Sequence, residues 1–151
     1  MNLSNAKRSE DTEQIRVINW CEINKDRYPE LKWIYHVGNG GSRNKLEAKK
    51  FKHMGVKAGV SDLCIPYPKG IYTGLYIELK YGNNTATDKQ REFLRDMAAV
   101  GHATAICYGA EAAIQFIRRY CECRSNESID IENDLSNCCL HLDHDGLLTV
   151  K

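Results

Sequence analysis

The segment 72–80 alternates apolar and polar residues, as a β-strand with two different faces does. Successive side chains of a strand point to opposite faces of the sheet, so Ile77 and Leu79 are expected on one face. Glu78 and Lys80 are then expected together on the other face. A charged group inside a sheet is costly unless it is paired or binds a metal, so this strand is a candidate functional site.

A second acid, Asp62, precedes Glu78 by sixteen residues and leads into a short apolar run. The pattern predicts a strand over 61–65, joined to the strand over 72–80 by a turn rich in proline and glycine. Two carboxylates from adjacent strands form the oxygen-rich arrangement that Mg²⁺ takes, with further oxygens from a substrate phosphate. Lys80 would then orient or deprotonate the attacking water and neutralise charge that develops on a phosphate.

The other predicted elements alternate between helices and strands. They are a helix over 10–27, a strand over 33–37, a basic helix from Asn44 to Gly55, a helix from Thr87 to Gly101, a strand over 103–108 and a helix over 110–120. This order predicts an α/β fold in which α-helices flank a mixed β-sheet. Residues 121–151 are acidic and contain Cys and His, and their pattern leaves the structure open between a lid, a partner-binding appendage and a partly disordered tail.

The length and composition fit one intracellular domain. A chain of 151 residues can bury an ordinary core, and it has neither a run of eighteen apolar residues nor an N-terminal apolar segment of the secretory kind. We therefore expect an intracellular protein, in the cytoplasm of a cell or of a phage-infected host, without membrane association. The seven cysteines are odd in number and several lie in apolar runs, which favours reduced thiols.

The net charge of +1 hides an uneven distribution. Residues 121–151 hold seven acids and two basic residues, so they carry −5 and the first 120 residues carry +6. Basic residues are concentrated between positions 43 and 57, which suits a polyanionic partner, although a solvated helix face explains the same pattern. The residues that we expect to contact phosphates are Arg43, Lys45, Lys49, Lys50 and Lys57.

Several motifs of the chain together resemble the VRR-NUC (virus-type replication and repair nuclease) branch of the PD-(D/E)XK nuclease superfamily. They are Asn39-Gly-Gly-Ser-Arg43, Gly59-Val-Ser-Asp62, Ile77-Glu-Leu-Lys80, Thr87-Asp-Lys-Gln90 and Gly101. The resemblance covers residues 10–120, with 121–151 as an extension, and implies a restriction-endonuclease-like fold. It further implies Mg²⁺- or Mn²⁺-dependent cleavage of DNA. The free-standing viral members resemble resolvases that act on branched DNA, such as Holliday junctions, as homodimers.

The resemblance implies a role for each residue of the two strands. Asp62 and Glu78 would hold the metal ion together with the main-chain carbonyl of Leu79, and Lys80 would be the catalytic lysine. The chain has Ser61 where the superfamily name has proline. A Glu-X-Lys segment alone is usually an exposed cross-strand charge pair, so the interpretation depends on Asp62 before it and on the motifs that follow.

Two further residues are implied from helices. Gln90 would point into the site from the first turn of its helix, although a capping box with Thr87 explains it equally well. Glu13, on the first helix, would complete the metal shell or hold a second ion. The helix dipole is a sufficient reason for an acid in that turn, and Glu10 or Asp11 could take the same role.

Other functions remain open from the sequence. A catalytically inactive DNA-binding or scaffold protein would keep the same fold, whereas an enzyme of small phosphate substrates would be expected to show a Walker or Rossmann glycine pattern, which is absent. His36 ends a predicted strand, but a lone histidine is more often structural. Cys121-x-Cys123 and Cys138-Cys139-x-His141-x-x-His144 have ligand types suited to zinc in a spacing that fits no known finger.

Overall fold

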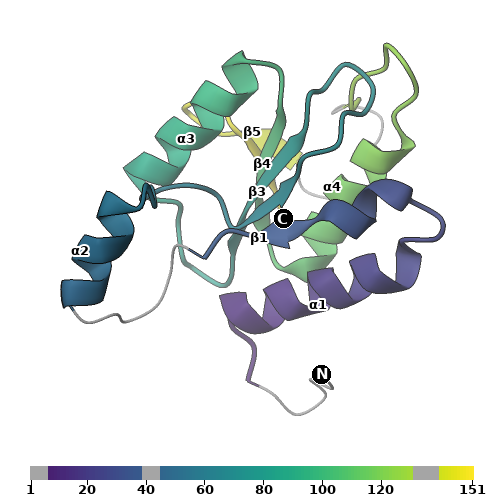
Figure 1. Cartoon of the computed structure of the whole chain (residues 1–151). Coiled ribbons are helices and arrows are strands. Elements are labelled where there is room, and N and C mark those ends of the chain that lie inside the picture. Colours follow the sequence, from purple (N-terminus) through teal and green to yellow (C-terminus); the bar gives the residue numbers. More distant parts are fainter. Residues whose placement is uncertain (1–6, 39–44, 131–139) are drawn as a thin grey trace.

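A computed structural model describes residues 7–38, 45–130 and 140–151 of the chain (Figure 1). The helices in these residues are α1 (Glu10–Asn24), α2 (Lys45–His53), α3 (Asp88–Ala99) and α4 (Ala110–Glu122), with a 3-10 helix η1 (Pro29–Trp33). The strands are β1 (Tyr35–His36), β2 (Leu63–Ile65), β3 (Leu75–Lys80), β4 (Ala103–Tyr108), β5 (Leu140–Leu142) and β6 (Leu148–Val150).

The described strands form one mixed sheet in the order β1-β2-β3-β4-β6-β5. Strand β3 pairs antiparallel with β2 and parallel with β4, and β6 continues the sheet parallel to β4. The helical connection through α3 accounts for the parallel pair, because parallel strands need a crossover rather than a tight turn. The mixed sheet flanked by helices confirms the predicted α/β fold class.

Helices cover both faces of the sheet. Helices α1 and α4 lie on one face and α3 lies on the other (Figure 1). The odd-numbered residues of β3 enter the larger core with α1 and α4, whereas the smaller core under α3 is built around Leu94 and Ile106. Strand alternation therefore turns Glu78 and Lys80 together toward the face that α3 covers, opposite Ile77 and Leu79. The sequence pattern predicted this separation of faces.

The first predicted helix and strand are shorter than expected. Helix α1 ends at Asn24 rather than at residue 27, and the backbone oxygen of Asn24 accepts hydrogen bonds from the amides of Arg27 (3.0 Å) and Tyr28 (2.9 Å). The predicted strand over 33–37 is reduced to β1. The proline after Tyr28 opens η1, which extends as far as Trp33 and leaves two residues to pair with β2.

The two central strands also begin later than predicted. Strand β2 starts at Leu63, so Asp62 lies just before it, and β3 starts at Leu75 rather than at residue 72. Tyr72 instead forms an isolated bridge with Lys69, which closes the turn before the strand. The two strands do form the expected antiparallel pair.

The described part of residues 121–151 belongs to the sheet and the core. Strand β6 pairs with β4, and Val150 is fully buried there. Ile129 is also buried, and its backbone N–H donates to the Tyr72 hydroxyl at 3.0 Å. This part of the segment therefore packs as an integral part of the fold. The sequence left it open because its strands are three residues long and pair with a distant partner.

Neither a membrane span nor a disulfide is found in the described residues. None of their helices combines the length and the apolar character that crossing a bilayer requires. Their cysteines are all buried and none is in a disulfide; they are Cys21, Cys64, Cys107, Cys121 and Cys123. Cys138 and Cys139 lie outside the described residues.

Candidate active site

Asp62 and Glu78 meet where the β2–β3 pair ends. The register pairs Leu63 with Ile77, and continuing it by one residue brings Asp62 opposite Glu78. The Oδ2 atom of Asp62 accepts a hydrogen bond from the backbone N–H of Leu79 at 2.8 Å. The strand pairing therefore brings together the two acids that are sixteen residues apart in the sequence.

Glu78 and Lys80 form a buried ion pair on the same face of β3. The Lys80 Nζ atom lies 2.7 Å from Glu78 Oε1, and the two side chains are 7% and 0% exposed. An exposed cross-strand pair, the alternative reading of this segment, would not be buried in this way. Buried charges are kept only where partners or a bound ion compensate their desolvation, so the pair is a candidate site and not a surface feature.

Gln90 takes part in two sets of interactions. Its side-chain oxygen accepts the backbone N–H of Thr87 at 2.8 Å, and the Thr87 hydroxyl accepts the backbone N–H of Gln90 at 3.4 Å, which completes a capping box. Its Nε2 atom donates to Glu78 Oε1. The structural and the functional interpretations of Gln90 are therefore compatible, because the amide group has an acceptor for the cap and a donor for the site.

The main-chain carbonyl of Leu79 points toward the Asp62 side of β3. The carbonyls of Gly74 and Lys80 accept hydrogen bonds from Ala103 and Gly109, on the β4 side. The N–H and C=O of one strand residue point the same way and alternate along the strand. The carbonyl of Leu79 therefore faces the edge where β2 has ended, on the side of the carboxylate that accepts its N–H.

Glu13 is fully buried, and its side chain contacts the N-terminus of α4. Its Oε2 atom accepts the backbone N–H of Ala110 at 2.8 Å and lies 3.1 Å from Arg16, and its Oε1 atom accepts from Arg8 at 2.8 Å. These contacts cap α4, whose N-cap residue is Gly109 and has no side chain to do so. The hydrogen bond from Arg8 is the main reason that the pKa of Glu13 is lowered. The metal role implied for Glu13 stays a prediction.

Glu10 is the acid of α1 that reaches the site. Its Oε2 atom lies 3.8 Å from Lys80 Nζ, and its Oε1 atom accepts a hydrogen bond from Asn84 at 2.8 Å. From the sequence, Glu10 was only an alternative to Glu13 for the acid that the first helix contributes to the site. The helical period could have distinguished the two acids. Glu13 lies one turn before Val17 on the buried face of α1, whereas Glu10 is the first residue of the helix.

His36 also adjoins the site, which the sequence did not establish. Its Nδ1 atom lies 2.9 Å from the backbone oxygen of Asp62. The β1–β2 register places His36 opposite Leu63, so the contact follows from strand pairing. His36 therefore helps to hold the backbone that carries Asp62.

Burial shifts the pKa values of the three charged groups. Burial, reinforced by the negative charge of Asp62, raises the pKa of Glu78 to about 7. Burial likewise raises the pKa of Asp62, against the opposing effect of the Leu79 N–H. Burial by itself lowers the pKa of Lys80, but the contact with Glu78 outweighs it and the net shift is upward. The single ammonium group of Lys80 therefore does not fully compensate the two carboxylates of Asp62 and Glu78.

The donor set fits a divalent metal ion. Glu78 Oε2 is buried and has no hydrogen-bond partner within the described residues. A buried acceptor without a partner is costly and rare, and a cation would satisfy it. Asp62, Glu78 and the carbonyl of Leu79 offer the hard oxygen ligands that Mg²⁺ and similar ions take.

A second acidic group lies in the turn between β5 and β6. Ligand atoms of Asp143, His144 and Asp145 lie within 4.8 Å of one another, and the described residues contain no other group of three or more such side chains. Asp143 binds Arg91, and Asp145 lies 3.2 Å from Arg91 and 3.3 Å from Arg95. Arginine therefore already compensates these acids. Cys138 and Cys139 of the suggested zinc set lie outside the described residues, and the other members of the set form no group of three ligands within them.

The basic residues predicted to contact phosphates lie on or near α2. Lys49 and Lys50 are exposed on this helix, and Lys57 is exposed in the loop after it. Lys45 begins the helix, and Arg43 lies outside the described residues, as do the neighbouring residues 39–42 of the glycine-rich motif. Their contacts with DNA stay predictions.

Comparisons with known proteins agree with this arrangement. The model of the VRR-NUC domain family matches residues 5–111, a range that includes all four of Asp62, Glu78, Lys80 and Gln90. A solved structure described as a VRR_NUC domain protein is 36% identical and superposes with a TM-score of 0.68, over 79% of this chain and 93% of that one. A comparison with curated proteins finds no match. The chain therefore belongs to the VRR-NUC domain family and has its nuclease-type fold.

Proposed function

We propose that this protein is a metal-dependent endodeoxyribonuclease that hydrolyses phosphodiester bonds of DNA. The observation that carries the proposal is the environment of Glu78. One of its oxygens is held by Lys80 and Gln90, and the other is buried without a hydrogen-bond partner in the described structure. A carboxylate fixed in this way, opposite Asp62, is suited to hold a cation rather than to stabilise the fold.

Mg²⁺ or Mn²⁺ fits the proposed donors, which are Asp62, Glu78 and the carbonyl of Leu79, because all three are hard oxygen ligands. Such an ion supplies positive charge for the scissile phosphate and makes an attacking water more acidic. Its binding would also offset the unfavourable proximity of the Asp62 and Glu78 carboxylates.

The protein side chains position and neutralise the reacting groups. Lys80 remains protonated beside Glu78, so its ammonium group can donate hydrogen bonds to the phosphate as negative charge develops there. Gln90 fixes the orientation of the Glu78 carboxylate through its Nε2 donor. Glu10 Oε2 lies 3.8 Å from Lys80 Nζ, so Glu10 can orient the ammonium group or accept a proton from water.

We further propose that the substrate is branched DNA, such as a Holliday junction, and that the protein acts as a homodimer. One site cuts one strand, so paired incisions across a junction require two copies related by symmetry. We propose residues 10–120 as the nuclease domain, whose sheet is extended by the described strands of residues 121–151. Light scattering should give twice the chain mass at working concentration, and a monomer would contradict the dimer.

The activity is tested with four-way junction, flap, single-stranded and linear duplex DNA in the presence of Mg²⁺, Mn²⁺ or EDTA. We expect the wild type to cut junction DNA with either metal and not with EDTA. Lys80→Ala should be slower by about 100-fold or more while still binding DNA. Lys25→Ala is a matched control, because Lys25 is an exposed lysine that pairs with Glu22 on α1.

The possible results separate the alternatives. If the wild type cuts no DNA with either metal but still binds it, the inactive DNA-binding alternative is right and the nuclease proposal is wrong. If Lys80→Ala cuts as fast as the wild type, the mechanism is wrong. If all four DNA substrates are cut at equal rates, the proposed specificity for branched DNA is wrong.

A further inference from the structure

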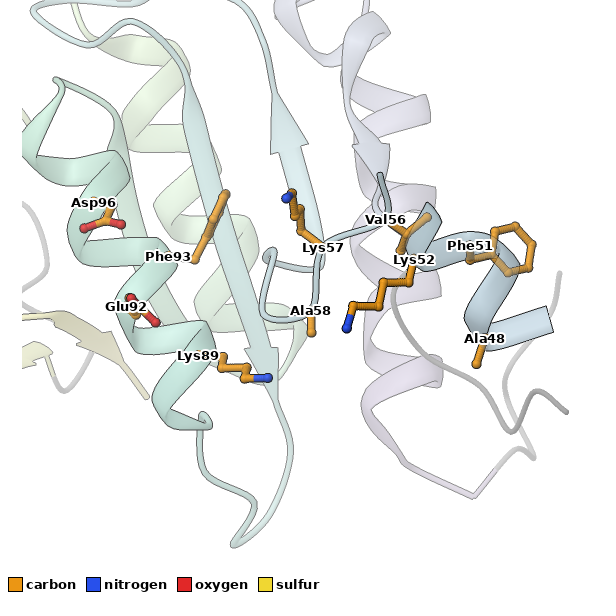
Figure 2. A pocket seen from close by; sticks show the side chains of 10 residues that line it. All are labelled: Ala48, Phe51, Lys52, Val56, Lys57, Ala58, Lys89, Glu92, Phe93 and Asp96. Atoms are coloured by element: carbon orange, nitrogen blue, oxygen red, sulfur yellow. The ribbon is translucent and has the colours of Figure 1, made fainter. Parts of the chain in front are cut away.

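A groove of about 840 Å³ lies between α2 and α3 (Figure 2). Val56 and Phe93 contribute apolar surface to it, and Lys52, Lys57 and Lys89 contribute positive charge. In Figure 2, Lys52 extends from α2 and Lys89 from α3 into the space between the two helices. The groove therefore combines an apolar wall with a basic rim.

The first turn of α3 contributes to both the groove and the proposed active site, because Lys89 lines the groove and Gln90 contacts Glu78. Lys89 directly precedes Gln90 on α3, and Lys57 precedes Asp62 by five residues. Gly59 packs tightly against α3: its φ is +91°, and an added Cβ would lie 2.7 Å from backbone atoms of Lys89. Only glycine tolerates this close approach, so the loop between the groove and the site is held against α3.

The charges of the groove are divided along α3. None of Lys52, Lys57 and Lys89 forms an ion pair with an acid of the described structure, and all three are exposed. The two acids of the lining, Glu92 and Asp96, follow Lys89 by about one and two helical turns. A phosphate is therefore attracted to the lysine end, next to Gln90, and repelled from the far end.

The aromatic ring of Phe93 is fixed in position by packing against the smaller core. Its ring forms a T-shaped pair with the ring of Tyr76 on β3, with centroids 5.0 Å apart and planes at 86°. Bases in duplex DNA are stacked on their neighbours, so their faces are covered. An unpaired base can stack on an aromatic side chain while lysines bind its phosphate, which is how many proteins bind single strands.

We propose that the groove between α2 and α3 binds an unpaired nucleotide of the DNA substrate beside the bond that is cut, with its phosphate at Lys52 and Lys89 and its base against Phe93 and Val56. The inference rests on the proposed nuclease function and adds to it a requirement for single-stranded character next to the site. Junctions and flaps provide such nucleotides, whereas a continuous duplex does not.

Binding in EDTA tests the groove without cleavage. Fluorescence anisotropy would compare a labelled single strand of about 12 nucleotides with a duplex of the same sequence. The variants are Lys52→Gln, Lys89→Gln and Phe93→Leu, the last of which keeps apolar volume but loses the aromatic face. Lys25→Gln removes the same charge as a control from an exposed position on α1. Thermal melting verifies that each variant is folded.

We expect Lys52→Gln and Lys89→Gln to weaken single-strand binding more than Lys25→Gln does, and each to reduce the slope of log affinity against log salt by about 0.7. Phe93→Leu should weaken single-strand binding by about 5-fold or more and leave duplex binding unchanged. Equal effects of the three lysine variants would overturn the phosphate site. An equal loss for single strand and duplex in Phe93→Leu would overturn the stacked base.

The same variants in Mg²⁺ separate this inference from the proposed function. A wild type that binds single strands through the groove but cuts no DNA would contradict the nuclease proposal alone. A wild type that cuts DNA, with groove variants that bind and cut like it, would contradict the groove alone.

Discussion

The side-chain amide of Gln90 joins the N-terminus of α3 to the carboxylate of Glu78 on β3. Its oxygen accepts the backbone N–H of Thr87, and its nitrogen donates to Glu78. A residue that caps the start of α3 and orients one carboxylate connects the stability of α3 to the geometry of the site. The two contributions can be separated by substitution because they use different atoms of one amide.

We expect Thr87→Ala to lower the free energy of unfolding by about 1 kcal/mol through loss of the cap, with a smaller effect on cleavage. Gln90→Glu keeps an acceptor for the Thr87 N–H but replaces the donor to Glu78 with a like charge. We expect this variant to lose about 10- to 100-fold in metal affinity or cleavage rate. Denaturant unfolding and metal-titrated cleavage measure the two effects, and a Gln90→Glu enzyme with normal cleavage would show that this contact is only structural.

Glu10 and Glu13 should respond differently to substitution. Glu13→Ala leaves the buried N–H of Ala110 without its acceptor, so we expect a loss of about 1–3 kcal/mol in the free energy of unfolding. Glu10→Gln keeps the oxygen that accepts from Asn84 and removes the charge near Lys80. We expect it to be nearly as stable as the wild type, because partly exposed pairs contribute about 0–1 kcal/mol, and to cleave more slowly.

Glu13→Gln is the informative companion of Glu10→Gln, since it keeps an acceptor for Ala110 while it removes the charge and the acceptor for Arg8. If Glu13→Gln is fully folded and loses more cleavage at limiting metal than Glu10→Gln does, the metal role implied by the family resemblance belongs to Glu13. The opposite order would assign the α1 acid of the site to Glu10.

Without metal, stability should fall as the pH rises. The pKa of Glu78 is raised from 4.5 to about 7 in the folded protein, so between these values the folded state holds a proton that the unfolded state has lost. The stabilising contribution is therefore fully present below pH 4.5 and is lost as the pH rises through 7. The change is up to about 3 kcal/mol.

Denaturant unfolding in EDTA from about pH 5 to about pH 8 measures this dependence. Glu78→Gln should flatten it, leaving the smaller contribution of Asp62, whose pKa is raised in the same direction. Added Mg²⁺ should stabilise the wild type more at high than at low pH, because the ion needs the deprotonated carboxylate. Identical pH profiles for the wild type and Glu78→Gln in EDTA would contradict the shift at Glu78.

The turn between β5 and β6 should stabilise α3 as well as its own hairpin. Asp143 accepts backbone N–H groups of Asp145 (3.0 Å) and Leu147 (3.1 Å) and binds Arg91. We expect Asp143→Ala to lower the free energy of unfolding by about 2 kcal/mol, and Asp145→Ala by less, because Asp145 is more exposed. Equal effects in denaturant unfolding would show that the contact with Arg91, not the turn, dominates.

Local patterns predicted most of the elements and the central residues of the site. The capping box at Thr87, the alternation in β3 and the order of helices and strands were all visible in neighbouring residues, and the α/β fold class followed from them. Strand ends were less predictable. The start of β3 depends on the bridge between Lys69 and Tyr72, and the length of β1 depends on the 3-10 helix before it.

The C-terminal strands could not be predicted from local patterns, for a physical reason. Strand β6 has three residues, and its stability comes from pairing with β4 and from burial of Val150 rather than from its own periodicity. The groove between α2 and α3 could not be predicted from local patterns either. It requires the close packing of Gly59 against Lys89, two residues that are thirty positions apart.

The sequence by itself determined which residue types stand at Asp62, Glu78, Lys80 and Gln90, and their alternation and spacing suffice for the family and the fold. Only the tertiary structure decided how they are partnered. It brought Glu10 rather than Glu13 beside Lys80, because Glu13 is turned into the core against Ala110. It also left one oxygen of Glu78 buried without a partner in the described structure, because Lys80 and Gln90 both bind the other oxygen. Spacing along a chain limits which side chains can share a face, whereas burial and pairing across elements decide which of them meet.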